Sequence, residues 1–168
     1  AESGDYHRAW QELVKNNPLP ALMGRVCYHP CENACNRATL DEAVSIHAVE
    51  RFLGDEARKN GWKIEKDAAA SGKKVLVVGA GPSGLSAAYH LARLGHTVSI
   101  YEAGPLAGGM MRFGIPKYRL PRDVLDAEIQ RILDLGITLK LNTRVDNIRS
   151  EEHTSELQSR LHLVCRLL

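Results

Sequence analysis

The pattern of apolar and polar positions changes in kind once along this chain. In its first part, apolar residues recur at helical spacing around 5–16 and again over 41–60. The segment "NNPLP" (16–20) ends the first helix, and Gly61 follows the second in the position typical of a helix C-terminus. We therefore predict a small all-helical domain at the front of the chain.

A polar, small-residue stretch over 67–73 reads as a linker, and after it strands alternate with helices. The expected elements follow in chain order: strand "KVLVVG" (74–79), helix "LSAAYHLARLG" (85–95), strand "TVSIYE" (97–102), extended "IPKYRLP" (115–121), a helix over 122–135 and a third strand in "ITLKLNTRV" (137–145). Short β-branched strands joined through helices are typical of a parallel sheet. The predicted fold class is α/β: an all-α domain over 1–66, then the first half of a Rossmann-like domain with a parallel sheet over 74–148.

The run "GAGPSG" carries the first candidate chemistry because it lies directly between a strand and a helix. In a GxGxxG motif, Gly79 makes the tight turn, Gly81 lets backbone approach a pyrophosphate, and Gly84 lets the helix pack on the strand. The free N–H groups at the helix N-terminus favour phosphate, and Glu102 ends the next strand where an acid can bind a ribose. We predict a dinucleotide site; the alternative is a glycine turn in an unrelated α/β unit. The motif alone does not separate FAD from NAD(P).

Three cysteines, Cys27, Cys31 and Cys35, follow one another at intervals of four in "CYHPCENAC". Three thiolates are one fewer than a closed four-ligand metal site needs. A Cys₃His zinc site that includes a nearby histidine is one interpretation, with His7, His29 and His47 as candidates. The dinucleotide motif further along favours redox work and hence iron–sulfur chemistry.

Composition narrows the class of protein. A hydrophobic share of 44% with 25% charged residues is ordinary for a globular domain, and a net charge of +2 without a basic, aromatic-rich cluster predicts no nucleic-acid partner. No apolar run reaches the ~20 residues of a membrane span, so we expect no membrane partner. The chain starts "AESGDYHRAW" without a Met or a signal peptide, so we expect a cytoplasmic protein cut at its front.

The last segment, 149–168, reads as foreign to the protein. "RSEEHTSELQS" and, after a short variable stretch, "HLVCRLL" match one reading frame of a common sequencing adapter. An amphipathic helix is the alternative interpretation of the same residues. We exclude this tail and its Cys165 from functional reasoning, and we expect the native sequence to break off near Ile148, inside a domain.

Four motifs in this order make the chain similar to a known family, that of the small (beta) subunit of NADPH-dependent glutamate synthase and the N-terminal region of dihydropyrimidine dehydrogenase. The motifs are "NPLPALMGRVCYHPCENACNR", "VSIHAVERF", "VVGAGPSGLSAAYHLARLGH" and "GGMMRFGIPKYRLPRDVLDAEI". In that family a helical iron–sulfur domain precedes an FAD domain, and an NADPH domain follows.

The resemblance implies roles for individual residues. The positions implied to bind FAD are Gly79, Gly81, Pro82, Ser83, Gly84, Glu102 (at the adenosine ribose), Gly109, Met110, Arg119 and Val145. Cys27, Cys31 and Glu50 would ligate one 4Fe–4S cluster with an upstream cysteine, and Cys35 would complete a second cluster with three upstream cysteines. Glu50 as a plain solvated helix residue and Arg119 as a support of its own turn remain alternatives.

The function implied is electron transfer. NAD(P)H would reduce FAD, and electrons would pass through 4Fe–4S clusters to a partner catalytic subunit or fused domain. No side chain reads as a general acid, base or nucleophile, and the chain as given is expected to be inactive by itself. The alternative is a non-catalytic dinucleotide-binding module with a structural zinc site.

Overall fold

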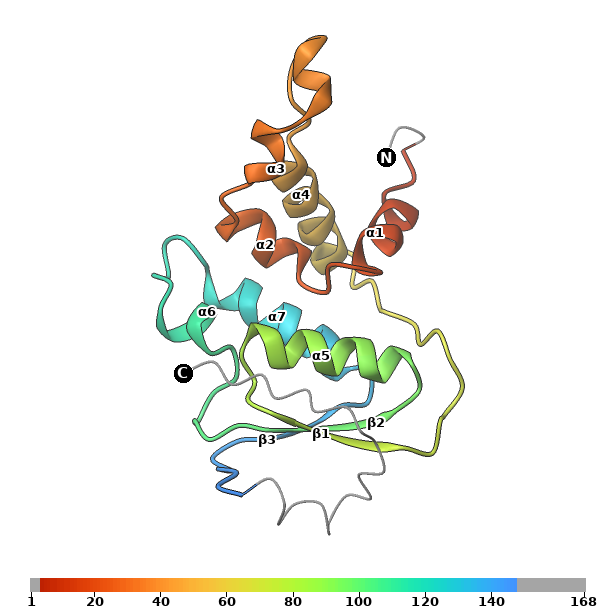
Figure 1. The fold of residues 1–168 in the computed structure, drawn as a ribbon, viewed down its shortest axis with the longest axis vertical. Coiled ribbons are helices and arrows are strands. Elements are labelled where there is room, and N and C mark those ends of the chain that lie inside the picture. Colours follow the sequence, from red (N-terminus) through yellow and green to blue (C-terminus); the bar gives the residue numbers. More distant parts are fainter. Residues whose placement is uncertain (1–3, 148–168) are drawn as a thin grey trace. The chain divides into compact units, whose positions relative to one another are not determined.

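The computed structural model describes residues 4–147 and confirms the predicted fold class: a helical part precedes a small parallel sheet (Figure 1). The chain divides into two compact units. Of the described residues, the first comprises 4–63 together with Lys117–Glu128, and the second comprises Ile64–Pro116 together with 129–147. Helix α7 (Arg122–Leu133) thus contributes residues to both units. The domain boundaries that the sequence suggested stay a prediction.

The first unit is built from short helices. Their bounds are α1 Tyr6–Val14, α2 Pro20–Val26, α3 Pro30–Asn33, the 3₁₀ helix η1 Asn36–Thr39, and α4 Ile46–Lys59. Asp5 caps α1, since its carboxylate accepts the N–H of Arg8 at 3.0 Å. Trp10 and Val14, one turn apart on α1, are buried in the core of this unit.

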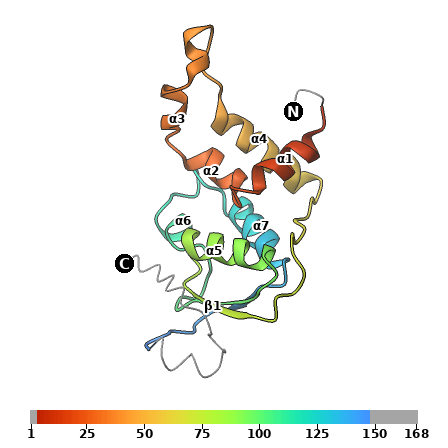
Figure 2. The same cartoon turned by 45° about the vertical axis from the view of Figure 1, so that its right-hand side comes forward.

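Two glycines allow α2 and α4 to cross closely (Figures 1 and 2). A Cβ on Gly24 of α2 would lie 2.5 Å from the backbone nitrogen of Arg51, and one on Gly54 of α4 would lie 2.4 Å from that of Ala21. Neither helix backbone could approach the other at this distance if a larger residue stood there. The crossing fixes the C-terminus of α2. There the segment 27–35 begins, which carries Cys27, Cys31 and Cys35 and is called the cysteine loop below.

Helix α4 begins five residues later than the predicted 41, a correction to the expected range of 41–60. Residues 41–45 lie outside the helix, and η1 together with an ion pair between Arg37 and Asp41 shapes the chain before them. The predicted end is confirmed. Gly61 has φ +63°, and the N–H of Trp62 donates to the carbonyl of Ala57 at 3.0 Å, as in a Schellman motif.

The second unit holds a three-stranded parallel sheet in the order β1-β2-β3. The strands are β1 Lys74–Val78, β2 Thr97–Tyr101 and β3 Thr138–Lys140. Val75 pairs with Val98 and Ile100 with Leu139. Helix α5, Pro82–Arg93, packs on β1 and β2 (Figure 2).

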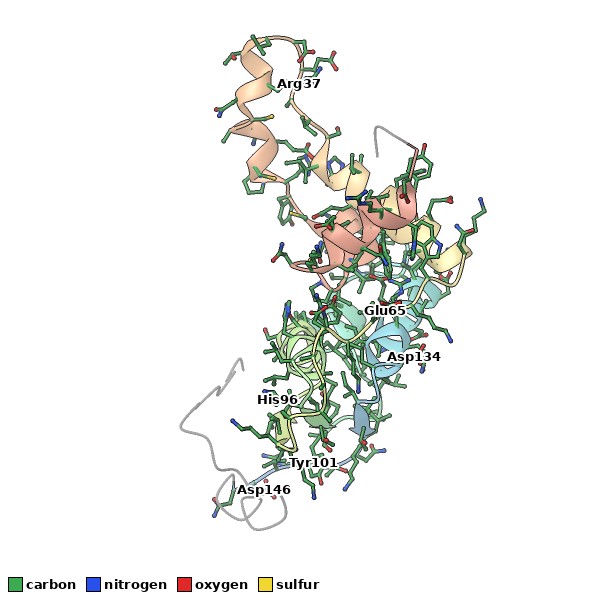
Figure 3. All side chains as sticks on the ribbon, turned by 90° about the vertical axis from the view of Figure 1, so that its right-hand side faces the viewer. Arg37, Glu65, His96, Tyr101, Asp134 and Asp146 are labelled. Atoms are coloured by element: carbon green, nitrogen blue, oxygen red, sulfur yellow. The ribbon has the colours of Figure 1, made fainter. Side chains whose placement is uncertain are left out.

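Two expectations for this part of the chain were wrong in detail. Residues 115–121 form turns in place of an extended run, because a proline such as Pro116 also suits the first corner of a turn. The third strand covers only 138–140; Asn142 then adopts φ +52° and the chain leaves the ladder. Tyr101 ends β2 (Figure 3). Its hydroxyl accepts a hydrogen bond from the ammonium of Lys140 at 2.9 Å.

The tail interpreted as adapter-derived lies outside the described residues, as does Ile148. Within 4–147, none of the helices combines the length and the apolar character needed to cross a membrane.

Candidate dinucleotide and metal sites

The glycine turn after β1 has the geometry that the motif predicts. Gly79 has φ +94°, which favours glycine, and a Cβ on Gly84 would collide with the carbonyl oxygen of Gly79. Gly81 differs from both. Its φ is −78°, and a Cβ there would meet nothing nearer than 3.9 Å, the Cα of Gly109. No atom of the described chain blocks a Cβ at 81, so two causes can account for glycine there: its suitability as a helix N-cap and a ligand close to the backbone.

Gly81 is also the N-cap of α5, with Pro82 and Ser83 in the first turn. Pro82 lacks an N–H and suits this first position. The remaining N–H groups of the first turn have no partners within the helix, which makes this end suitable for a phosphate.

Glu102 lies directly against the glycine turn. Its Oε2 accepts the N–H of Ala80 at 2.7 Å, and its Oε1 accepts the N–H of Gly104 at 2.8 Å. The parallel sheet explains this proximity, because β1 and β2 end side by side and Glu102 is the first residue after β2. The acid and the glycine turn predicted from the sequence are thus brought together.

The second glycine pair packs on the first glycine turn. The N–H of Gly108 donates to the carbonyl of Ala80 at 2.8 Å, and Gly109 has φ +49°. Met110 begins the short helix α6, Met110–Phe113, and its side chain is 72% exposed. Gly109 therefore lies at the dinucleotide turn, and Met110 presents apolar surface next to it.

Val145 follows a segment that pairs with the end of β2. The N–H of Thr143 donates to the carbonyl of Glu102 at 2.8 Å, and that of Asn142 donates to Gly104 at 3.0 Å. Val145, two residues further, is half-buried. This segment thus belongs to the same edge of the sheet as the predicted ribose-binding acid.

Arg119 lies in the first unit, with the cysteine loop. Its guanidinium carbon is 5.5 Å from the ring centre of Tyr28. A hollow of about 380 Å³ is lined here by Gly24, Arg25, Cys27, His29, His47, Arg51, Tyr118, Arg119 and Pro121. Arg25, Arg51 and Arg119 thus lie around one of the predicted cluster ligands, Cys27, and the first two are ion-paired with Asp55.

The three cysteines lie on one loop and are held by different contacts. Cys27 caps the C-terminus of α2, and its sulfur accepts the N–H of His29 at 3.3 Å. Cys31 lies within α3, and Cys35 is the N-cap of η1. Cys27 and Cys31 are exposed and Cys35 is half-buried, and all three thiols are free.

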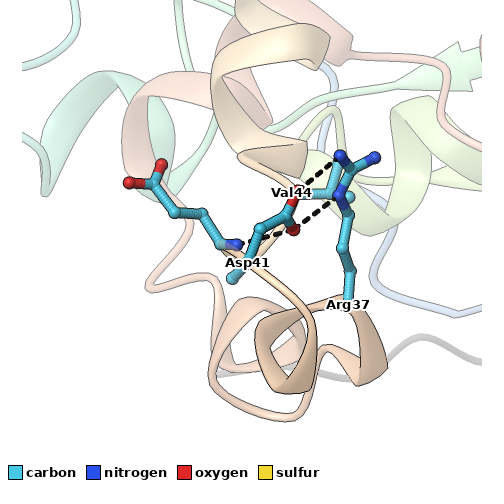
Figure 4. Close-up of a pocket in the computed structure, with 5 residues that line it drawn as sticks. Arg37, Asp41 and Val44 are labelled. Carbon is cyan, nitrogen blue, oxygen red and sulfur yellow. Dashed lines mark hydrogen bonds and ion pairs between the residues drawn. The ribbon is translucent and has the colours of Figure 1, made fainter.

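The environment of Cys35 favours the thiolate. The backbone N–H of Val44, followed by that of Arg37, lowers the pKa of the Cys35 thiol. Both residues border a shallow hollow of about 490 Å³ in which Arg37 makes a paired ion contact with Asp41, 2.7 Å at its shortest (Figure 4). A thiolate that accepts amide N–H groups is suited to ligate a metal or cluster.

Glu50 lies half-buried on α4, where its Oε1 accepts the side-chain N–H of Asn17 at 3.2 Å. Asn17 is itself fixed, since its own oxygen accepts the N–H of Leu19 at 3.1 Å. Glu50 is therefore held in place by a neighbour that sequence analysis did not single out. Asn17 and Glu50 are 33 residues apart, and no local pattern links them.

Among residues 4–147, one group of three metal-ligand types has its ligand atoms within 4.8 Å of one another, and it contains none of the cysteines. This group is His29, Glu32 and His47. Two thiolates on one tetrahedral zinc ion would lie about 3.8 Å apart, given Zn–S bonds of about 2.3 Å. No group of three ligand atoms that includes a cysteine is thus pre-formed at zinc-like spacing among residues 4–147.

Glu32 is a residue that sequence analysis missed. Its Oε1 accepts both the backbone N–H and the ring Nδ1–H of His47, at 2.9 and 2.7 Å, and these bonds, the ring bond foremost, lower the pKa of the Glu32 carboxyl. The two residues are 15 positions apart, and no short motif relates them.

Comparison with known proteins matches both parts of the chain. Residues 1–62 match the family described as dihydropyrimidine dehydrogenase domain II with a 4Fe-4S cluster, and residues 77–136 match the family of NAD(P)-binding Rossmann-like domains. Among solved structures, histamine dehydrogenase from Rhizobium sp. 4-9 aligns with 51% of this chain and 14% of its own at 28% identity, with a TM-score of 0.37 that is too low to bear on the fold.

Curated relatives match over most of the chain. The beta subunit of NADP(+)-dependent formate dehydrogenase from Moorella thermoacetica is 43% identical, over 86% of this chain and 24% of that protein. The small chain of NADPH glutamate synthase from Bacillus subtilis (strain 168) is 39% identical, over 84% and 29%. The NAD-dependent dihydropyrimidine dehydrogenase subunit PreT from Salmonella typhimurium is 38% identical, over 84% and 35%.

The chain spans between 24% and 35% of the length of these relatives. Two family matches in the predicted order, joined to relatives of the predicted kind, confirm the resemblance that the four sequence motifs carried. The chain belongs to the family of the glutamate synthase small chain and dihydropyrimidine dehydrogenase, of which it carries the segment that joins an iron–sulfur domain to a Rossmann-like domain.

Proposed function

We propose that this chain is the part of an electron-transfer oxidoreductase that binds FAD and supplies some of the ligands of its 4Fe–4S clusters. Its relatives are named as NAD- or NADP-dependent dehydrogenase and glutamate synthase subunits, which supports redox work with a nicotinamide donor. In a full-length protein of this kind, electrons would pass from NAD(P)H to a partner catalytic subunit or fused domain. We further propose a cytoplasmic location.

The observation that carries the proposal is the free space at Gly81. The residue has an ordinary φ and nothing within 3.9 Å of a Cβ, while Gly79 and Gly84 are required by the chain's own backbone. A pyrophosphate on the N-terminus of α5 accounts for the missing side chain. Glu102, hydrogen-bonded to the same turn, is placed to accept ribose hydroxyls in exchange for one of its backbone donors.

The residues fit the two cofactors by their donor chemistry. Gly79, Gly81, Pro82, Ser83, Gly84, Glu102, Gly109, Met110, Arg119 and Val145 are the proposed FAD-binding set. Cys27, Cys31, Cys35 and Glu50 are the proposed cluster ligands, together with cysteines from outside this chain. When bound, FAD would accept a hydride and release single electrons to the clusters. The chain's own part is to bind and orient these groups.

The proposal is tested in the full-length protein by two variants on the two sides of the linker. Cys27→Ser should lower the iron and acid-labile sulfide content and keep FAD, because a hydroxyl is a poor iron–sulfur ligand. Gly81→Val should lose FAD and keep iron. Electron flow to the partner should collapse in the first variant, while reduction of a flavin-reactive dye survives. If Cys27→Ser keeps all its iron and instead loses bound zinc, the cluster proposal is wrong.

A further inference from the structure

Glu32 links the cysteine loop to helix α4. It connects the segment that carries one proposed cluster ligand, Cys31, to the helix that carries another, Glu50. It follows Cys31 directly in α3, and its Oε1 accepts the backbone N–H of His47 at 2.9 Å and the ring Nδ1–H of His47 at 2.7 Å. His47 lies three residues before Glu50, so both lie on neighbouring positions of one helix face. The Glu32 side chain is only 12% exposed although Cys31 beside it is exposed.

The link also supplies the cap that α4 lacks locally. Ser45 occupies the N-cap position but makes no side-chain capping hydrogen bond. The first N–H groups of a helix need an acceptor from elsewhere, and a carboxylate satisfies them best because it also complements the helix dipole. Glu32 provides that acceptor to His47, the second residue of α4, from 15 positions upstream.

His29 extends the contact to Cys27. Its ring stacks on the ring of His47 with centroids 4.2 Å apart and an angle of 15°. Its Nδ1 lies 3.3 Å from the carbonyl of Cys27, and its backbone N–H donates to the sulfur of Cys27 at the same distance. Cys27 through its contacts with His29, and Cys31 through its chain neighbour Glu32, are thus both linked to His47 of α4.

A metal ion held by His29, Glu32 and His47 is a poorer interpretation of the same atoms. Nδ1 of His47 must carry its proton, because a carboxylate oxygen only accepts, and so this nitrogen is not free to bind a metal. The two rings are stacked and nearly parallel, so their nitrogen lone pairs lie in two separate, nearly parallel planes and do not converge readily on one ion. The hydrogen bonds favour a structural contact.

We propose that Glu32 is a positioning residue that fixes Cys31 relative to Glu50 and so pre-forms this chain's share of the cluster site. This inference rests on the proposed function. Ordering a loop costs conformational entropy, and a loop already held on α4 does not incur that cost when the cluster binds. Outer contacts that orient metal ligands typically change metal affinity or activity about 10- to 100-fold when they are removed.

The test compares four variants of the full-length protein by the rate at which they release iron to a chelator. Glu32→Ala should release iron about 10- to 100-fold faster than the unmodified protein, with an altered paramagnetic resonance signal of the reduced cluster and an unchanged FAD content. Glu32→Gln keeps an oxygen that accepts the N–H of His47 and should recover most of the retention. Glu42→Ala, an exposed acid of the same loop, should behave as the unmodified protein.

Cys27→Ser, the fourth variant, separates the two proposals. If Cys27→Ser loses the cluster while Glu32→Ala releases iron at the unmodified rate and keeps its resonance signal, the positioning role is wrong and the proposed function stands. If Cys27→Ser keeps its iron, the proposed function itself fails. Retained FAD and an unchanged helical circular dichroism signal in Glu32→Gln would show that this variant is folded. If Glu32→Gln released iron as fast as Glu32→Ala, the proposal would also be contradicted, because the retained hydrogen-bond acceptor would then have no effect.

Discussion

The backbones of Gly81 and Gly109 meet, so that a Cβ on Gly109 would lie 2.8 Å from the Cα of Gly81. The two residues belong to different glycine segments 28 positions apart, and the hydrogen bond from Gly108 to Ala80 holds the segments together. The glycine turn that contains Gly81 is therefore packed against a second loop, which contains Gly108 and Gly109.

Gly109→Ala should separate these two loops. The new methyl would clash with Gly81, and φ +49° is a region where an L side chain is strained, at a cost of about 1–3 kcal/mol. We expect the free energy of unfolding of the chain to fall by this amount in a urea titration. Gly81→Ala is the matched control, because its Cβ meets nothing nearer than 3.9 Å, and it should lose only the preference of a helix N-cap for glycine over alanine.

Gly81→Val should affect FAD binding much more than it affects the stability of the fold. A Cβ at 81 meets no atom of the described chain nearer than 3.9 Å, so the free energy of unfolding without ligand should fall by only the roughly 1 kcal/mol typical of a poorer N-cap residue. In the full-length protein, the same substitution should abolish FAD retention, because a β-branched side chain occupies the place of the pyrophosphate. The measurement is the ratio of FAD to protein after gel filtration. Yellow, FAD-loaded variant protein would contradict the site.

Gly54→Ala tests the crossing of α2 and α4. Alanine favours a helix over glycine by about 1 kcal/mol, yet its Cβ would lie 2.4 Å from the backbone nitrogen of Ala21, and overpacking of this kind typically costs about 1–3 kcal/mol. We expect a net loss of stability in thermal unfolding followed by circular dichroism. Lys59→Ala, an exposed position of the same helix, should have little effect. A more stable Gly54→Ala variant would mean that the two helices are not packed this closely.

The thiol of Cys35 should have a lower pKa than an ordinary thiol. The amides of Val44 and Arg37 favour its thiolate and so lower its pKa, which means that the thiolate persists to lower pH in the folded chain than in the unfolded chain. The measurement is the pH dependence of iodoacetamide alkylation in a metal-free variant that keeps Cys35 alone, with Cys27, Cys31 and Cys165 changed to Ser. The midpoint should lie at lower pH in buffer than in concentrated urea. Equal midpoints would contradict the assigned environment.

The 168-residue chain should not oxidise NAD(P)H. It holds a single GxGxxG motif, which we assign to FAD, and so offers no second dinucleotide site for a hydride donor. We expect no decrease in NADPH or NADH absorbance above the rate without protein when FAD is added. Turnover that depends on both FAD and this chain would overturn the assignment of the motif.

Local sequence patterns were enough to predict the elements whose causes are local. The helix around 5–16, the end of α4 at Gly61, the strands of the sheet and the turn at Gly79 each depend on residues within a few positions, through periodicity, a positive φ or the spacing of a motif. The position of Glu102 beside the glycine turn was also predictable, because neighbouring parallel strands end at the same edge of a sheet.

Contacts between distant segments decided the rest. The start of α4 depends on a cap from Glu32, and the place of Glu50 depends on Asn17, at separations of 15 and 33 residues that no helical or strand period encodes. The closeness of Gly81 and Gly109 likewise requires two loops to fold against each other. By itself the sequence determined which residues are candidates to bind a dinucleotide and to ligate iron; the tertiary structure decided which neighbours hold them, because backbone donors and packing partners are assigned only when the segments meet.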